Sequence, residues 1–311
     1  MTNASDKSAG LPREMQLPLA VLLVVMAINY PLFQVGLDYA PPIWFAFLRA
    51  ALGAAATWLL LLSLGRLKRL PAREAAYALL LGIPAMGIVL SFQLLGMLTV
   101  GAGQASVYGN SVPLWILLFV IAFGRRPDRM LLAAGALGFI GTAVVAFGSA
   151  AGLGSGSLVG ALLLLVAAAL WGLTSLLARR TFPLEHLETV NAWELLSASA
   201  VLIVWALLTE SPNAIHWSEP FLFAILWTGA IGIGIAYTIW YLLLSRARAA
   251  EFSQYLFVVP LIALGISAAF LGEAVTALQA LGIAMVLGSV YLVSRSSGSE
   301  APSAHIATPG R

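Results

Sequence analysis

The chain contains no cysteine and only three histidines, and charged residues make up 9% of its 311 residues. The missing cysteines exclude disulfide bonds, thiolate catalysis and cysteine-ligated metal sites. Soluble domains carry about 25% charged residues, whereas 61% of this chain is hydrophobic. No globular core could bury that much apolar surface, which indicates that lipid surrounds most of the chain.

Sequence signatures of catalysis are also missing. The histidines His186, His216 and His305 fall in predicted loops or in the terminal tail, so no metal cluster is expected inside the membrane. There is no G-x-S-x-G nucleophile elbow, no Gly-x-Gly-Asp aspartyl pair and no phosphate-binding P-loop. We therefore expect no enzyme activity, no metal and no cofactor. If the chain moves a solute, it must use a gradient rather than ATP, or act as a passive facilitator.

Ten apolar runs are long enough to cross a bilayer, for which a helix needs about 20 residues. We predict an all-α integral membrane protein with spans at 17–37, 42–64, 75–98, 104–123, 130–149, 156–178, 187–208, 220–244, 252–271 and 276–294. Residues 1–16 form a polar tail, and the apolar run that follows is too long for a signal-peptide core. Residues 295–311 are rich in Ser, Pro and Gly and are expected to be a disordered tail.

The basic residues test this count, because cytoplasmic loops carry an excess of Lys and Arg. All of them except Arg49 fall before span 1, after span 10 or in connections 2–3, 4–5, 6–7 and 8–9, which share one side of the membrane. The opposite loops offer Asp38, Glu210, Glu219 and Glu273 with His216. We therefore predict that both termini are cytoplasmic. Because the basic residues lie in short loops between membrane spans and form no basic patch on a soluble face, we expect no nucleic acid as a partner.

Two similar stretches, YGNSVPLW from Tyr108 and YLFVVPLI from Tyr255, lie 147 residues apart. Further identities at this offset are Gly82/Gly229, Gly87/Gly234, Ser106/Ser253, Pro113/Pro260 and Gly135/Gly282. They predict two five-helix repeats, at 17–149 and 150–294. Because five is odd, the second repeat starts on the other side of the membrane and is inverted. Inverted repeats recur in secondary transporters, with the substrate site near the midplane between them.

Prolines inside the predicted spans indicate helices that face the interior. A proline within a helix removes one backbone hydrogen bond and frees a carbonyl, which cannot face lipid. Helix kinks are predicted at Pro31, Pro84, Pro113 and Pro260. The alternative is that each kink serves packing alone, with no ligand nearby.

Aromatic and neutral polar residues follow the same helices. The predicted substrate-binding residues are Trp171, Tyr108, Tyr237, Tyr255, Tyr30, Ser175, Gln93, Trp115 and Tyr241. Aromatic faces can stack on a solute ring or hold an ammonium group by cation–π attraction. A cavity with such walls suits an amphipathic small molecule. The alternative is that the rings only fill the protein interior.

Two charged residues, Arg49 and Glu194, are expected within the membrane, at nearly equivalent places in the two repeats. Embedded charges are costly and mark function or pairing by default. The functional alternatives are a gate ion pair, a carboxylate-binding Arg49 or a proton-carrying Glu194. The structural alternatives are an arginine bonded to helix-end carbonyls and a glutamate that reaches the inner surface. The sequence leaves open whether the two residues interact.

Several segments resemble one transporter family. They are VVPLIALGISAAFLGEAVTALQALGIAMVLGS with its Gly272-Glu273 step, FLRAALGA around Arg49, and ALW ending at Trp171. Over nearly its whole length the chain resembles the EamA family of the drug/metabolite transporter superfamily, and among its members the YddG-type aromatic amino-acid exporters. The first repeat departs from the signature with Arg125-Arg126. The resemblance implies a central cavity lined by spans 1, 3, 4, 6, 8 and 9.

Together with the resemblance, these observations predict an exporter of amino acids, aromatic and other apolar ones preferred, in the bacterial inner membrane. It would work by alternating access through a central cavity between the inverted repeats. Its expected partners are this small-molecule substrate and the lipid bilayer. One alternative is efflux of amphipathic drugs or another small metabolite. Another is a non-transporting membrane sensor or scaffold. The exact substrate range, proton coupling and the oligomeric state are left open by the sequence.

Overall fold

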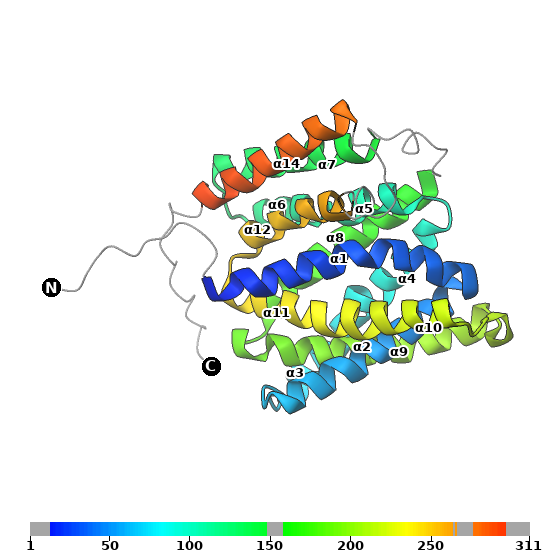
Figure 1. Ribbon diagram of the computed structural model, residues 1–311. Coiled ribbons are helices and arrows are strands. Elements are labelled where there is room, and N and C mark those ends of the chain that lie inside the picture. Colours follow the sequence, from blue (N-terminus) through cyan, green and yellow to red (C-terminus); the bar gives the residue numbers. More distant parts are fainter. Residues whose placement is uncertain (1–12, 148–157, 264, 266–275, 297–311) are drawn as a thin grey trace.

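The computed structural model describes residues 13–147, 158–263, 265 and 276–296, and every regular element in that part of the chain is a helix (Figure 1). The first half contains α1 (Arg13–Tyr39), α2 (Pro42–Ser63), α3 (Ala72–Gly82), η1 (Ile83–Ile88), α4 (Val89–Met97), α5 (Ala102–Gly109), α6 (Val112–Ala122) and α7 (Arg129–Phe147). The second half contains α8 (Leu158–Thr181), η3 (Leu184–His186), α9 (Leu187–Thr209), η4 (Pro212–Ala214), α10 (Glu219–Leu226), η5 (Trp227–Ile235), α11 (Ala236–Arg246), α12 (Ala249–Phe252), η6 (Ser253–Val258) and α14 (Ala277–Ser296).

Eight helices in the described ranges are long and apolar enough to cross a membrane. They are Arg13–Tyr39, Pro42–Ser63, Ala72–Met97, Ala102–Ala122, Leu158–Thr181, Leu184–Thr209, Glu219–Arg246 and Ala277–Arg295. Each coincides with one predicted span to within a few residues. Two shorter apolar helices, Arg129–Val145 and Ala249–Ala263, begin one and three residues before the predicted spans 130–149 and 252–271. Of the predicted polar tails, residues 13–16 belong to α1 and residues 295–296 to α14. The rest of both tails and Glu273 lie outside the described residues.

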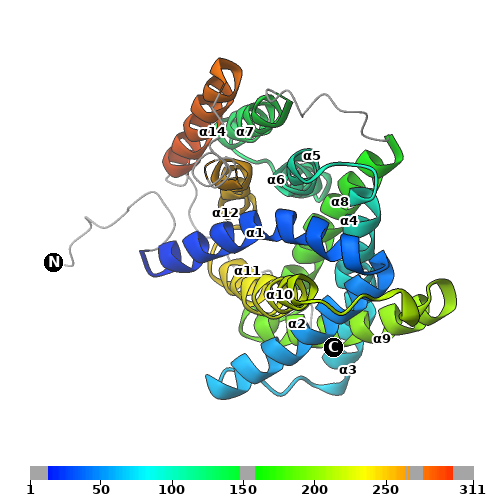
Figure 2. The ribbon, with the colours of Figure 1, turned by 45° about the vertical axis from the view of Figure 1, so that its right-hand side comes forward.

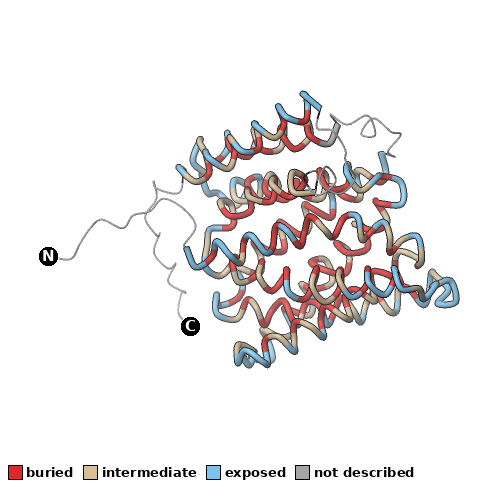
Figure 3. The backbone as a smooth tube through the Cα atoms, viewed as in Figure 1, coloured by how far each residue is buried: buried red, intermediate tan, exposed pale blue. Residues whose placement is uncertain are grey.

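The N-terminal end of α1 and the C-terminal end of α14 lie on one side of the bundle (Figure 1). The connection between α9 and α10 lies on the opposite side. Large apolar side chains such as Leu59, Leu158 and Leu208 are exposed. Figure 3 shows this separation, with buried residues on the inward sides of the helices and exposed ones outside. Such an apolar exterior is what a lipid solvent requires.

The helices α7 and α14 lie side by side at one edge of the bundle in both ribbon views (Figures 1 and 2). Their contact is close because it runs through glycine: a Cβ atom at Gly141 would lie 2.9 Å from the carbonyl oxygen of Gly282. Small residues allow helices to approach in this way within membranes.

Departures from α-helical geometry occur at matching places in the two halves. The π-helical segment η1 (83–88), moved by the 147-residue offset, falls on 230–235, inside the π-helical segment η5. Pro84 lies at the start of η1. The equivalence is notable because π-helical turns are rare and often occur at functional sites.

The other predicted kink positions differ in their surroundings. Pro113 is the second residue of α6, directly after the break at Asn110 and Ser111 that separates α6 from α5. Pro260 follows the 3-10 segment η6. Pro31 lies within the continuous helix α1. In three of the four places, therefore, the proline stands at a change of helix type or at a break.

The two helices with embedded charges, α2 and α9, pack against each other, and each also packs on a glycine of the other half. A Cβ atom at Gly229 in η5 would lie 3.2 Å from the carbonyl oxygen of Arg49 in α2. A Cβ atom at Gly82 in α3 would lie 2.5 Å from the Cα of Glu194 in α9. Gly82 and Gly229 are equivalent in the repeat, so the two contacts are reciprocal.

Candidate functional site

A small cavity of about 30 Å³ lies where the two halves of the chain meet. It is lined by Met26, Asn29, Tyr30, Phe33, Val89, Gln93, Gly109, Asn110, Leu164, Ala167, Ala168, Trp171 and Tyr237. These residues come from predicted spans 1, 3, 4, 6 and 8. Because one water molecule needs roughly 10–15 Å³ measured in this way, the cavity has room for about two or three waters. Side chains therefore fill the space that an amino acid would need.

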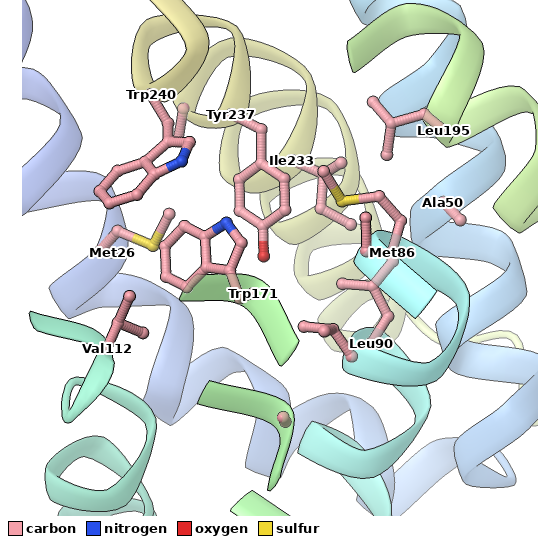
Figure 4. Close-up of a cluster of buried hydrophobic side chains, with 14 of the residues drawn as sticks. Met26, Ala50, Met86, Leu90, Val112, Trp171, Leu195, Ile233, Tyr237 and Trp240 are labelled. Carbon is pink, nitrogen blue, oxygen red and sulfur yellow. The ribbon is translucent and has the colours of Figure 1, made fainter. Parts of the chain in front are cut away.

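Stacked aromatic rings form one wall of this cavity. The rings of Trp171 in α8 and Tyr237 in α11 are 5.4 Å apart at an angle of 14°, and Trp240 lies behind them, 4.7 Å from Trp171. Figure 4 shows Trp171 and Tyr237 next to each other, with Met26 of α1 beside the indole. Rings packed on one another in this way form a rigid apolar wall.

The phenol of Tyr30 is another part of the cavity lining. Its hydroxyl accepts a hydrogen bond of 3.4 Å from Nδ2 of Asn110, and the Gln93 side chain lies beside it. Gly109 makes this position possible, since a Cβ atom there would overlap the Tyr30 hydroxyl. The break after α5 thus places a glycine and an amide against a residue of α1.

Three buried polar atoms of the cavity side chains have no hydrogen-bond partner in the described part of the chain. They are Oδ1 of Asn29, Oε1 of Gln93 and Nε1 of Trp171. Buried polar atoms in proteins are nearly always hydrogen-bonded. Two acceptors and one donor that lack partners around one cavity are what a polar ligand would satisfy.

Arg49 and Glu194 are both buried, with 1% and 0% of their surface exposed. Nε and Nη1 of Arg49 have no hydrogen-bond partner among the described residues, and its Cζ lies 4.0 Å from the centre of the Phe33 ring. Glu194 accepts a hydrogen bond from the Tyr241 hydroxyl. Within the described ranges, the salt bridges join other residues, so no gate ion pair between Arg49 and Glu194 is formed.

Four of the nine predicted substrate-binding residues line the cavity: Tyr30, Gln93, Trp171 and Tyr237. Two others lie close behind the wall and bond to protein. Ser175 accepts a hydrogen bond of 3.1 Å from Nε1 of Trp240, and Tyr241 donates to Glu194. Their hydroxyl groups are already used within the protein.

The remaining three predicted residues do not line the cavity. The ring of Trp115 stacks on Phe119 at 6.3 Å. Tyr108 and Tyr255 are half-buried, and Tyr255 packs on the smaller apolar cluster that includes Leu117. Gly109, the neighbour of Tyr108, lines the cavity, whereas Tyr108 does not.

Asn29, Phe33 and Asn110 line the cavity but were not selected from the sequence. Asn29 and Phe33 are four residues apart and flank Tyr30, so helical periodicity around that tyrosine could have identified them. Asn110 is harder to identify as a lining residue from the sequence, because it is one of several polar residues within YGNSVPLW. Its place depends on the helix break, which the sequence pattern did not predict.

The relatives found by comparison with known proteins are named as transporters or as an efflux pump. The chain is 29% identical over 284 residues to the uncharacterized transporter YvbV of Bacillus subtilis, covering 90% of this chain and 91% of that protein. It is 26% identical to the uncharacterized inner membrane transporter YedA of Escherichia coli, covering 89% of each. It is 25% identical to a probable amino-acid metabolite efflux pump of Salmonella typhimurium, covering 88% of this chain and 93% of that protein.

A solved crystal structure has the same fold, with a TM-score of 0.76 over 92% of this chain and 98% of that one, at 19% identity. The family model described as the EamA-like transporter family matches twice, at residues 16–147 and 158–295. Together these two matches span most of the sequence and all eight helices of spanning length. The chain is a multi-pass membrane transporter that belongs to the EamA-like transporter family.

Proposed function

We propose that the protein exports amino acids, with aromatic and other apolar ones preferred. The observation that carries this proposal is the cavity wall, which combines stacked rings with buried polar atoms that lack partners in the described chain. The rings suit an apolar side chain, and Oδ1 of Asn29 with Oε1 of Gln93 can accept hydrogen bonds from an ammonium group. The efflux pump named for the Salmonella relative supports this substrate class.

The bacterial inner membrane is the location that the name of the Escherichia coli relative supports. We propose ten spans there, in two inverted repeats at 17–149 and 150–294, with polar tails at 1–16 and 295–311 and both termini cytoplasmic. The equivalent π-helical segments and the reciprocal contacts of Gly82 and Gly229 support a two-fold relation between the repeats.

Alternating access between these repeats is the proposed mechanism. The cavity is too small for an amino acid, so a loaded state requires the walls to separate. The two π-helical segments lead directly into cavity residues: Val89 follows η1, and Tyr237 lies two residues after η5. A change of helix register in either segment would therefore move a wall.

Reconstitution tests the function. Liposomes that contain the purified protein should accumulate labelled phenylalanine faster than liposomes without it. Trp171→Ala should lower this uptake because it removes half of the stacked wall, while Trp115→Ala, a tryptophan away from the cavity, should keep it. Equal uptake with and without protein would reject amino-acid export. Protection of cells against cationic dyes instead would favour drug efflux, the alternative that the aromatic wall also suits.

A further inference from the structure

We propose that Arg49 is the anion-binding group of the central cavity, so that the exported solutes must carry a carboxylate. The inference rests on the proposed function, because it assumes that a small amphipathic solute enters between the two halves. Beyond that function, the inference names the residue whose positive charge would select among such solutes.

The guanidinium of Arg49 is a buried cation without a carboxylate beside it in the described chain. The residue is 1% exposed, and its Nε and Nη1 atoms have no hydrogen-bond partner there. The carboxylates in salt bridges belong to Glu74, Glu188 and Glu251, each with a different partner. An unpaired charge within a membrane protein is costly and is relieved by an anion. Within the described ranges, therefore, Arg49 is a buried positive charge that no carboxylate neutralises.

This charge lies directly behind the cavity wall. Its Cζ atom is 4.0 Å from the centre of the Phe33 ring, which lines the cavity. Two further wall residues, Tyr30 and Tyr237, lie close enough to influence its charge. Arg49 is not itself a lining residue, so the cavity wall, which includes these aromatic side chains, separates the guanidinium from the small open space. Moving one of them as the cavity widens would give a solute direct access to the cation.

The polar groups of the site then match both ends of an amino acid. A guanidinium binds a carboxylate through two parallel N–H···O bonds, which a neutral amide cannot reproduce with equal strength. The free acceptors Asn29 Oδ1 and Gln93 Oε1 lie on the cavity wall itself, where the ammonium group would bind. A cationic amphipathic drug offers the ammonium and the rings but leaves the guanidinium unpaired. Arg49 would therefore reject it.

A purely structural role for Arg49 makes a different prediction. Phe33 and Phe45 both lie near the guanidinium, with the Phe45 ring centre 5.5 Å from Cζ, and cation–π contact holds the residue between them. If that were its whole function, loss of the charge would change stability and would affect all solutes alike. Discrimination between solutes with and without a carboxylate separates the two roles.

The experiment measures competition with labelled phenylalanine in liposomes that contain the full chain. The competitors are 3-phenylpropionate, which has only the carboxylate, and phenylalanine amide, which lacks it. In the wild type we expect 3-phenylpropionate to compete at least tenfold better than the amide. Arg49→Gln should abolish this preference, and Arg49→Lys, which keeps the charge without the planar fork, should retain part of it. Glu194→Gln, the other embedded charge, should leave the preference unchanged.

Two outcomes would overturn the inference: a wild type that does not distinguish the competitors, or an Arg49→Gln variant that keeps the preference. Thermal stability separates this result from failure of the proposed function. If no amino acid is transported, 3-phenylpropionate should still raise the melting temperature of the wild type but not that of Arg49→Gln. If Arg49→Gln does not fold, Arg49→Lys serves in both assays, and an undiminished preference or melting shift in that variant would count against the inference.

Discussion

Gly109 shows how much of the site depends on a single missing side chain. A Cβ atom at this position would overlap the Tyr30 hydroxyl, so Gly109→Ala should force the phenol out of its place on the wall. Overpacking of this kind costs about 1–3 kcal/mol, and we expect phenylalanine uptake to fall roughly tenfold at unchanged expression. Uptake by reconstituted protein measures the effect.

The same helix supplies a matched control. Gly103 in α5 has no atom within 4 Å of an added Cβ, so Gly103→Ala should transport normally. Combining Gly109→Ala with Tyr30→Phe removes the clashing hydroxyl and should restore part of the uptake. If the double variant stays as inactive as Gly109→Ala alone, Gly109 does not act through Tyr30.

Single residues also show why the sequence predicted only part of the site. Helical periodicity places Trp171 and Ser175 on one stripe, and both turned out to face the same region. Periodicity does not reveal that Nε1 of Trp240 donates a hydrogen bond to the Ser175 hydroxyl, because that contact depends on how α8 and α11 pack. Trp115 was selected on its helix face, yet its partner is Phe119 of the same helix.

At the scale of elements, the ends of the apolar runs predicted the helices well, because the thickness of the bilayer sets their length. The π-helical segments η1 and η5 and the break at Asn110 were not predicted. Pro84 and Pro113 lie close to two of these irregularities, η1 and the break. However, the hydrogen-bond register of a helix also depends on the helices that pack against it. In η1 and η5 those neighbours are α9 and α2.

The contact between α3 and α9 gives a test at this scale. Gly82→Ala should destabilise the protein by about 1–3 kcal/mol, since the added Cβ would lie 2.5 Å from Glu194 Cα. Gly87→Ala, in the adjoining segment, meets no atom nearer than 3.9 Å and should be neutral or mildly stabilising. Thermal unfolding in detergent compares the two variants. Equal destabilisation would contradict the role of this packing contact.

For the whole molecule, the proposed orientation can be tested with few changes because the chain has no cysteine. Asn213 and Arg69 are both exposed, in the connections α9–α10 and α2–α3. In intact cells, a membrane-impermeant thiol reagent should label Asn213→Cys at once and Arg69→Cys only after permeabilisation, because the basic loop is expected to be cytoplasmic. The reverse pattern would place the termini outside.

The closed cavity has a thermodynamic consequence for the whole molecule. When the binding-competent state is a fraction of the population, apparent affinity falls by that fraction, so an open state at roughly 1% weakens binding about a hundredfold. Weak solute binding would then measure the free energy that holds the walls together rather than poor complementarity. Leu164→Ala, which enlarges the cavity without removing a polar group, should tighten phenylalanine binding in a calorimetric titration, whereas unchanged or weaker binding would show that closure does not limit affinity.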